Sequence, residues 1–404
     1  MLAETEKRHE KLALSLSGTN LVRAGDYNQR TVLQAIRLAG ETTRIDLARV
    51  TGLTAPTIAN ITGRLSELGF VRQAGRRQGG RGQPALRLVI EPDGCFGLGI
   101  NIDRDHISLI ALDLAGEVRA RVTREIAFAT PAMVYACIEE ELDGLIAAGK
   151  VRRERILGVG IALPDDLGRI DLPHRPAEYA AWSDVDPREL LAPLLPWPIH
   201  CDNDAAAAAL GEVEASTGFA YPSFFYMLVS FGLGGGLVID RSYYRGATLR
   251  SGEIGLLPDP SANHPGATVQ DTVSLSALLA RLERAGRALP AEADLAAAAE
   301  GSDPVLFEWL HDATRSLVGP LIAINCLINP DAVLIGGRLP MPLITSLSAR
   351  LNARLGELAL PARAPVLPAA MAQDAPAVGA AMLPFRKELL PSDINLIQAG
   401  RGAD

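Results

Sequence analysis

Apolar side chains in the first third of the chain recur every three or four residues, which is the spacing of helices that bury one face. They predict one helix over residues 28–38, ended by Gly40, a second over residues 45–50, and a third that has Pro56 in its first turn. Residues 51–54 form a glycine-bearing turn before the third helix. Helix, helix, turn and helix is the order of a helix-turn-helix domain. The positions that carry this pattern are Val32, Leu33, Ile36, Ile58, Ile61, Leu65 and Leu68.

The pattern then changes to two short strands, over residues 70–72 and 85–90, joined by a glycine-rich loop over residues 75–84. The loop holds Arg76, Arg77 and Arg81 and no acidic residue. A hairpin with a cationic tip directly after a helix-turn-helix predicts a winged helix, and Arg81 between glycines suits a narrow minor groove. A solvated linker is the alternative, which the concentration of arginines disfavours.

From residue 95 onward three consecutive strands are followed by alternating helices and strands, and this order occurs twice. The pattern predicts a duplicated α/β architecture with a cleft between two lobes. The expected strands cover residues 95–102, 107–112, 117–126, 156–161, 195–200, 224–230, 235–240, 243–244 and 332–337, and the expected helices cover residues 132–148 and 304–327.

A polar stretch, Asp202, Asn203 and Asp204, stands where the strand over residues 195–200 is expected to give way to a helix. Open α/β sheets bind ligands at such strand ends. Asn203 can donate and accept hydrogen bonds and an ionised Asp204 only accepts, so the pair can read adjacent hydroxyls or take a proton from one. The alternative is that Asp202 or Asn203 merely caps a helix that the five following alanines make easy to form.

Charge is distributed unevenly along the 404 residues, whose formal net charge is −8. Residues 1–90 hold 14 Lys and Arg against 7 Asp and Glu, or +7, and the remainder holds 25 against 40, or −15. A basic head on an acidic body indicates a nucleic-acid-binding module joined to one with another role. The four cysteines form no C-x-x-C pair, and no apolar run reaches the length of a membrane span, so we expect a cytoplasmic protein.

The third helix should carry the DNA contacts. If its apolar side chains face the core, Thr54, Thr57, Asn60 and Arg64 face outward, with Thr57 and Asn60 as base readers and Arg64 against a phosphate. We expect Arg76, Arg77 and Arg81 of the wing to join them. A plain three-helix bundle is the alternative, because every such bundle has a polar outer face.

Six motifs, taken in order, resemble the ROK family of repressors and sugar kinases, a branch of the actin-like ATPase fold. They are residues 158–164 (Gly-Val-Gly-Ile-Ala-Leu-Pro), 202–204 (Asp-Asn-Asp), 231–236 (Phe-Gly-Leu-Gly-Gly-Gly), 252–255 (Gly-Glu-Ile-Gly), 329–331 (Asn-Pro-Asp) and 335–337 (Ile-Gly-Gly). With the winged helix in front, residues 28–382 look like a ROK transcriptional regulator. The resemblance implies an α/β fold, a winged helix-turn-helix followed by a two-lobed actin-like domain.

We expect four segments: an arm or helix over residues 1–25, the DNA-binding domain over 26–91, one lobe over 92–200 and the second over 201–404, with the C-terminal helix returning to the first lobe. Residues 101–105 (Asn-Ile-Asp-Arg-Asp) stand where ROK kinases resemble one another in an Asp-x-Gly-Gly-Thr loop that holds ATP phosphates. Asp103 and Asp105 would oppose a polyphosphate there, so we expect neither kinase activity nor a cofactor.

The family's zinc site is also expected to be missing. Leu256 stands where the family has a His ligand, residues 257–273 contain no cysteine, and His264 is alone. We therefore expect no metal, and packing to hold the Pro-rich segment 258–265.

The resemblance assigns sugar contacts to Asn203, Asp204 and Glu253, whereas Leu256 and Gln270 replace two further polar contacts. Three functions follow. A repressor, released from operator DNA by a sugar effector and acting as a homodimer or homotetramer, is favoured. A sugar kinase with Asp204 as general base is the alternative, and a dimerisation scaffold with an inactive pocket is the third. No membrane partner is expected.

Overall fold

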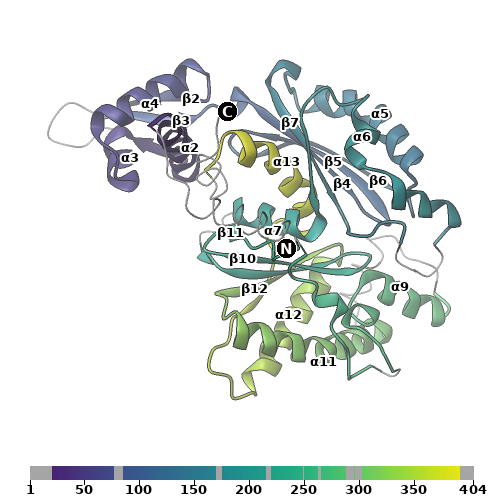
Figure 1. The fold of residues 1–404 in the computed structure, drawn as a ribbon. Helices are drawn as coiled ribbons and strands as arrows, with labels where there is room; N and C mark the ends of the chain where they lie inside the picture. The colour runs from purple at the N-terminus through teal and green to yellow at the C-terminus, as the bar shows by residue number, and fades with distance from the viewer. Residues whose placement is uncertain are drawn as a thin grey trace, which may run out of the picture.

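The computed structural model describes residues 21–76, 85–169, 175–214, 220–248, 250–262, 265–287, 295 and 303–391. A small winged domain lies beside two larger sheets, each with helices on its outer face (Figure 1). The α/β class and the order of a winged helix followed by two lobes are thus confirmed. None of the helices in the described part of the chain has the length and apolar character needed to cross a membrane.

The winged domain contains three helices, α2 (Leu21–Ala39), α3 (Arg44–Thr51) and α4 (Ala55–Glu67). Its sheet has the order β1-β3-β2, made of β1 (Glu41–Thr43), β2 (Val71–Arg76) and β3 (Leu86–Ile90). Helix α2 is longer than the predicted helix because it begins at Leu21. Strand β1 was not predicted, since three residues are too short to display an alternating pattern.

The two lobes contain sheets with the same topology. The first has the order β6-β5-β4-β7-β8 and the second the order β11-β10-β9-β12-β13, and in both sheets three antiparallel strands continue into two parallel ones. The predicted duplication is therefore present. The strands are β4 (Phe96–Ile102), β5 (His106–Asp113), β6 (Val118–Glu125), β7 (Ile156–Leu163), β8 (Ile199–Asn203), β9 (Phe224–Val229), β10 (Leu233–Ile239), β11 (Ser242–Tyr243), β12 (Ala332–Gly337) and β13 (Val366–Pro368).

Helices cover the outer faces of both sheets. The first lobe carries α5 (Pro131–Ala148) and α6 (Pro187–Leu191), and the second carries α9 (Leu275–Arg284), α11 (Pro304–Leu327) and α12 (Met341–Gly356). Short 3₁₀ turns complete the chain: η1 (Pro92–Gly94), η2 (Arg153–Arg155), η3 (Ala177–Asp184), η4 (Ile254–Leu256), η5 (Val269–Asp271) and η6 (Ala372–Asp374). Each lobe has its own buried apolar cluster beneath these helices.

Two helices, α7 (Asp204–Glu214) and α13 (Ala375–Glu388), lie between the sheets, and α13 contacts β4, β5 and β7 of the first lobe (Figure 1). The five alanines of α7 are almost completely buried, because their small side chains let the two helices approach closely. A side chain at Gly379 would collide with the backbone of Ala207, and one at Gly160 would collide with that of Ala380. The alanine run thus serves packing between the lobes.

Strand β8 lies further along the chain than the predicted strand over residues 195–200, so that prediction was wrong. Pro196 and Pro198 have no N–H to give to a sheet, and regular pairing begins only at Ile199. Asp202 and Asn203 consequently belong to the strand, and the helix begins at Asp204.

Candidate ligand site between the lobes

Polar side chains gather where two neighbouring parallel strands end. Leu163 at the end of β7 pairs with Asn203 at the end of β8, and Asp165 follows β7 directly. The carboxyl ends of parallel strands meet at one edge of a sheet, which is where α/β proteins place ligands.

Asn203 both caps helix α7 and faces this edge. Its Oδ1 accepts hydrogen bonds from the backbone N–H groups of Ala205 (2.9 Å) and Ala206 (3.1 Å). Its Nδ2 donates to Asp165 Oδ2 at 3.2 Å. The capping interpretation is correct for Asn203, but it does not exclude ligand binding, because the side chain also lines a cavity at this edge.

Asp204 is 7% exposed and lies at the first position of helix α7. Its Oδ1 accepts a hydrogen bond from Ala205 N–H at 2.8 Å. Burial, followed by the negative charge of Asp103, raises the pKa of Asp204 to about 7, although Arg104 opposes the shift. A carboxyl group with this pKa changes its charge near neutral pH, and its ionised form gains from any hydroxyl that donates to it.

Glu253 reaches the same edge from the second lobe. Gly252 adopts a φ of +90°, and a side chain there would collide with the backbone of Gly235 in β10. Only glycine therefore lets the chain pass this close to β10 and present Glu253. Glu253 shares a small recess with Asp165, Asn203 and Arg250.

Arg250 ties the two lobes together across this recess. Its guanidinium lies 2.5 Å from Asp166, 3.6 Å from Asp165 and 3.5 Å from Glu253. Burial raises the pKa of Asp165, and the charge of Arg250 opposes that rise. Of the acceptors that the resemblance assigns to a sugar, Glu253 is thus held by an arginine.

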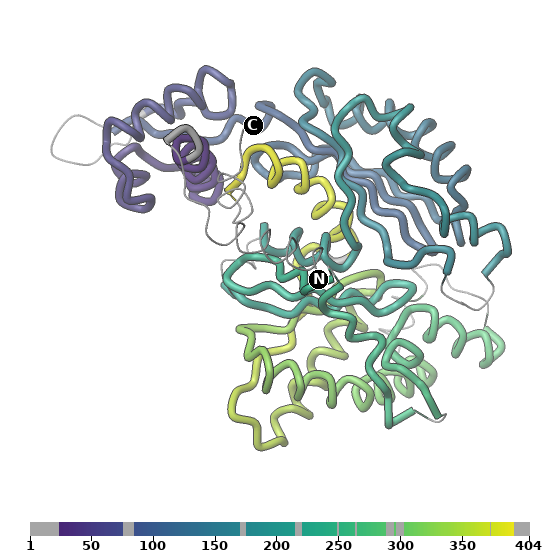
Figure 2. Tube along the Cα trace, viewed as in Figure 1, coloured from purple at the N-terminus to yellow at the C-terminus, as the bar shows by residue number. Residues whose placement is uncertain are grey.

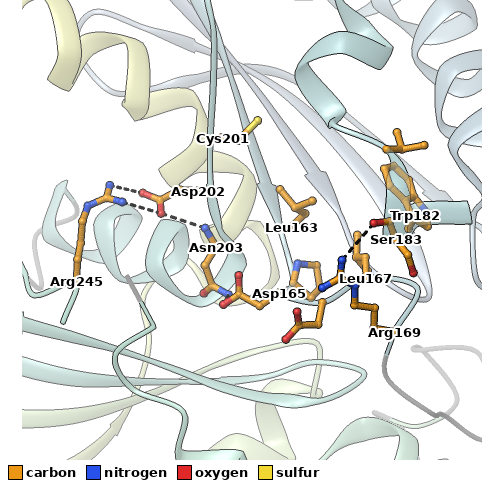
Figure 3. Close-up of a pocket in the computed structure, with 13 residues that line it drawn as sticks. Leu163, Asp165, Leu167, Arg169, Trp182, Ser183, Cys201, Asp202, Asn203 and Arg245 are labelled. Atoms are coloured by element: carbon orange, nitrogen blue, oxygen red, sulfur yellow. Dashed lines mark hydrogen bonds and ion pairs between the residues drawn. The ribbon is translucent and has the colours of Figure 1, made fainter. Parts of the chain in front are cut away.

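A cavity of about 400 Å³ adjoins the recess. Asp165, Asp202 and Asn203 form its polar wall, Leu163 and Trp182 line it with apolar surface, and Asp202 is bound in two places by Arg245, at 3.1 and 2.5 Å (Figure 3). A few placed polar groups on a partly apolar wall are typical of small-molecule sites. The cavity and recess, with Asp204 beside them, are called the interlobe site below.

Several residues of the interlobe site were not predicted, among them Asp165, Arg245 and Arg250. Asp165 directly follows residues 158–164, so the strand-end argument applied to Asn203 would have found it. The arginines gave no sequence signal, since each reaches the site from an irregular segment after β11.

A second connection between the lobes lies at the turn between β4 and β5. Arg338, which follows β12, donates to Asp105 at 2.9 Å and to both oxygens of Glu125 at 3.1 and 2.7 Å. The buried side chain of Arg104 approaches Gly232 in the turn between β9 and β10. These contacts, called the arginine clasp below, lie where the resemblance places the phosphates of a kinase substrate.

Asp103, Asp105 and His106 hold potential metal-ligating atoms within 4.8 Å of one another, which no other three residues do in the part of the chain that the structure describes. His106 Nδ1 lies 2.7 Å from Asp105 Oδ1. Burial would lower the pKa of His106, but the hydrogen bond to Asp105 and the charge of Asp103 raise it. Burial would raise the pKa of Asp105, but His106 and Arg338 lower it. These three residues are thus joined to one another and to Arg338 by hydrogen bonds and charge.

The segment at the family's zinc position is held by a buried carboxylate, Asp259, and not by packing alone as predicted. Its Oδ2 accepts from the hydroxyls of Ser316 (2.7 Å) and Thr272 (3.0 Å). Its Oδ1 accepts from the backbone N–H and hydroxyl of Ser261, at 2.9 and 2.6 Å. Leu256 is exposed, and His264 lies outside the described residues.

The predicted DNA-contacting residues of α4 lie on its outer side. Thr54, Asn60 and Arg64 are exposed and Thr57 is half-buried. Thr54 also caps α4, and its hydroxyl lies 2.8 Å from that of Thr57. Arg76 ends β2. Arg77 and Arg81 lie outside the described residues, so their placement stays a prediction.

A winged helix joined to a duplicated two-lobed α/β domain is the class of protein that this fold defines. A solved structure described as a ROK family transcriptional regulator, homologous to the Escherichia coli MLC protein, superposes with a TM-score of 0.68 at 22% identity, over 94% of this chain and 99% of that one. A ROK family glucokinase from Streptomyces griseus, in complex with glucose and AMPPNP, gives 0.52 at 21% identity, over 71% of this chain and 98% of that one.

The model of the ROK family matches residues 97–387, and the chain therefore belongs to this family. The xylose repressor of Bacillus subtilis is similar over most of the chain. It is 25% identical over 367 residues, which make up 87% of this chain and 93% of the repressor.

Proposed function

We propose that this protein is a sequence-specific DNA-binding transcriptional repressor that a sugar or sugar derivative releases from its operator. The xylose repressor supports this proposal, because the 87% of this chain that it matches is too long to lie within the ROK domain alone and so extends into the N-terminal part. The sugar would bind at the interlobe site through Asn203, Asp204 and Glu253. Double-stranded operator DNA would be read by Thr57 and Asn60.

One observation carries the proposal: helix α7 joins the interlobe site to the winged domain. The helix begins at Asp204 and ends, about 16 Å further along its axis, at Glu214. Glu214 forms a buried ion pair with Arg37 of α2, and Arg37 also donates to the carbonyl of Leu114 at 2.9 Å. A shift of α7 caused by a ligand would therefore act directly on the winged domain.

Helix α13 belongs to the same buried apolar cluster as α2. Ala377, Val378 and Met382 share one buried cluster with Val32 and Leu33 of α2. Arg30 also donates to the carbonyl of Lys387 at 3.0 Å. Since α13 packs on α7 along its length, a change at the interlobe site would alter the orientation of two winged domains in a dimer.

The kinase alternative rests on the pKa of about 7 at Asp204, which suits a general base, and on the fold shared with the glucokinase. The arginine clasp speaks against it. A polyphosphate would have to displace Arg338 from two carboxylates and would meet Asp103 and Asp105.

A gel-shift titration with the DNA upstream of the protein's own coding sequence tests the proposal. We expect a retarded complex that weakens as salt increases, because phosphate contacts release counterions. Incubation with ATP, Mg²⁺ and a panel of sugars should form no ADP above the rate without sugar. Absence of a DNA complex at moderate salt, or sugar-dependent ADP formation, would overturn the proposal.

A further inference from the structure

A second and larger cavity lies between the winged domain and the ROK domain. Its volume is about 600 Å³, which lies in the range of small-molecule sites. Its walls come from α2, α6, β8, α7, the β10–β11 hairpin and α13. Figures 1 and 2 place α2 on the side of the winged domain that faces the end of α13, and residues of both helices line this cavity. It is called the interdomain cavity below.

The lining of the interdomain cavity is positively charged. Of the described residues, two acidic ones line it, and each is already in an ion pair: Asp202 with Arg245 and Glu214 with Arg37. The cationic residues that face it are Arg188, Arg241, Arg245, Arg386 and Lys387. An excess of cations around a concave surface favours a small anion.

Among the residues that the structure describes, two buried polar atoms in the lining have no hydrogen-bond partner, Oε1 of Gln34 and Nε2 of His200. Buried polar atoms are nearly always paired, so such atoms in a cavity wall indicate groups that a ligand would satisfy. Burial, followed by the charge of Lys387, lowers the pKa of His200, and its neutral ring can either donate or accept at Nε2. A ligand with hydroxyl groups would suit both atoms.

We propose that the interdomain cavity binds a small phosphorylated metabolite. Its phosphate would lie between Arg188 of α6 and Lys387 of α13, and its hydroxyls would reach Gln34 of α2 and His200 of β8. Arg188 pairs only loosely with Asp186, at 3.7 Å, so its guanidinium can turn to a phosphate. Such a ligand would hold the winged domain and the ROK domain in one relative orientation.

The interdomain cavity and the interlobe site share part of one wall. Cys201, Asp202 and Arg245 line both, and the ion pair between Asp202 and Arg245 separates them. Ligands at the two sites are therefore coupled through that pair, and the coupling is reciprocal. An effect of the phosphorylated ligand on DNA binding rests on the proposed function, whereas its binding does not.

Isothermal titration of the full chain with glucose 6-phosphate, inorganic phosphate and glucose tests this proposal. Saturable binding of glucose 6-phosphate is expected, with weaker binding of phosphate alone. The double variant Arg188→Gln and Lys387→Gln should weaken it at least about tenfold, since both charge-assisted hydrogen bonds are lost. Arg354→Gln, an exposed arginine on α12, is the matched control and should bind like the natural protein.

The variant Asp204→Asn distinguishes binding at the interdomain cavity from binding at the interlobe site. The variant should still bind glucose 6-phosphate, because Asp204 does not line the interdomain cavity. A ligand at the interlobe site would instead lose affinity. Unchanged binding in the double variant, loss in Asp204→Asn alone, or no saturable binding at millimolar concentration would each overturn the proposal. If the double variant fails to fold, Gln34→Leu takes its place and should also weaken binding, with unchanged affinity counting against the proposal.

Discussion

Replacement of Asp204 by Asn should make the protein more stable at alkaline pH. Folding raises the pKa of this carboxyl group from 3.8 to about 7, so the folded state favours the protonated form. Its contribution to stability is complete below pH 3.8 and is lost as the pH rises through 7. About three pKa units at 1.36 kcal/mol each give a loss of about 4 kcal/mol above pH 7.

Asn keeps the size of the side chain and the acceptor for Ala205 N–H, but it never ionises. The variant should therefore avoid most of this loss at pH 8.5 and match the natural protein near pH 4. Asp143→Asn, at an 83% exposed carboxylate, should show no such pH-dependent gain.

Urea denaturation of all three proteins between pH 4 and pH 8.5 provides the measurement. The free energy of unfolding of Asp204→Asn minus that of the natural protein should increase as the pH rises from 4 to about 7 and stay level above that. A difference that is independent of pH, or a natural protein that is more stable than the variant at pH 8.5, would refute the assignment of a raised pKa.

Other predictions concern the clasp, the segment near β11 and the wing. Arg338→Gln removes the arginine that pairs with Asp105 and Glu125 across the lobes. We expect the protein to lose about 2 kcal/mol of stability and to exchange backbone amide hydrogens faster at residues 101–106, as measured by urea denaturation and hydrogen exchange. Asp259→Asn loses acceptors for buried hydroxyls, so the free energy of unfolding should fall by about 1–3 kcal/mol. Proteolysis within residues 257–272 should become faster, and unchanged cleavage would contradict the role of Asp259. Arg81→Ala should weaken DNA binding and reduce the slope of log affinity against log salt by about 0.9, as measured by fluorescence anisotropy, and an unaltered slope would argue against a phosphate contact.

Periodicity was enough to place the long elements of the fold. The helix predicted over residues 304–327 is α11, and the strand predicted over residues 332–337 is β12. Apolar side chains of both elements pack into the same buried cluster, and this packing accounts for their apolar pattern. The error at β8 arose because the apolar residues preceding Pro196 and Pro198 pack against the core without forming strand hydrogen bonds.

The candidate site was only partly predictable, because several contacts join residues far apart in sequence. Arg338 and Asp105 are separated by 233 positions, and neither residue carries a local signal for the other. Arg37 and Glu214 pair across 177 positions for the same reason. Motif resemblance identified Asn203, Asp204 and Glu253. The arginines beside them, Arg250 at Glu253 and Arg245 at Asp202, required the folded chain.

The most direct test of the account is whether a sugar acting at Asp204 changes affinity for DNA. Fluorescence anisotropy would measure binding of the full chain to its upstream DNA with and without each sugar of a panel. One sugar should weaken the natural complex, and in Asp204→Asn its effect should need at least about tenfold more sugar, since an ionised acceptor is lost. No response to any sugar, or the same response in both proteins, would contradict the account.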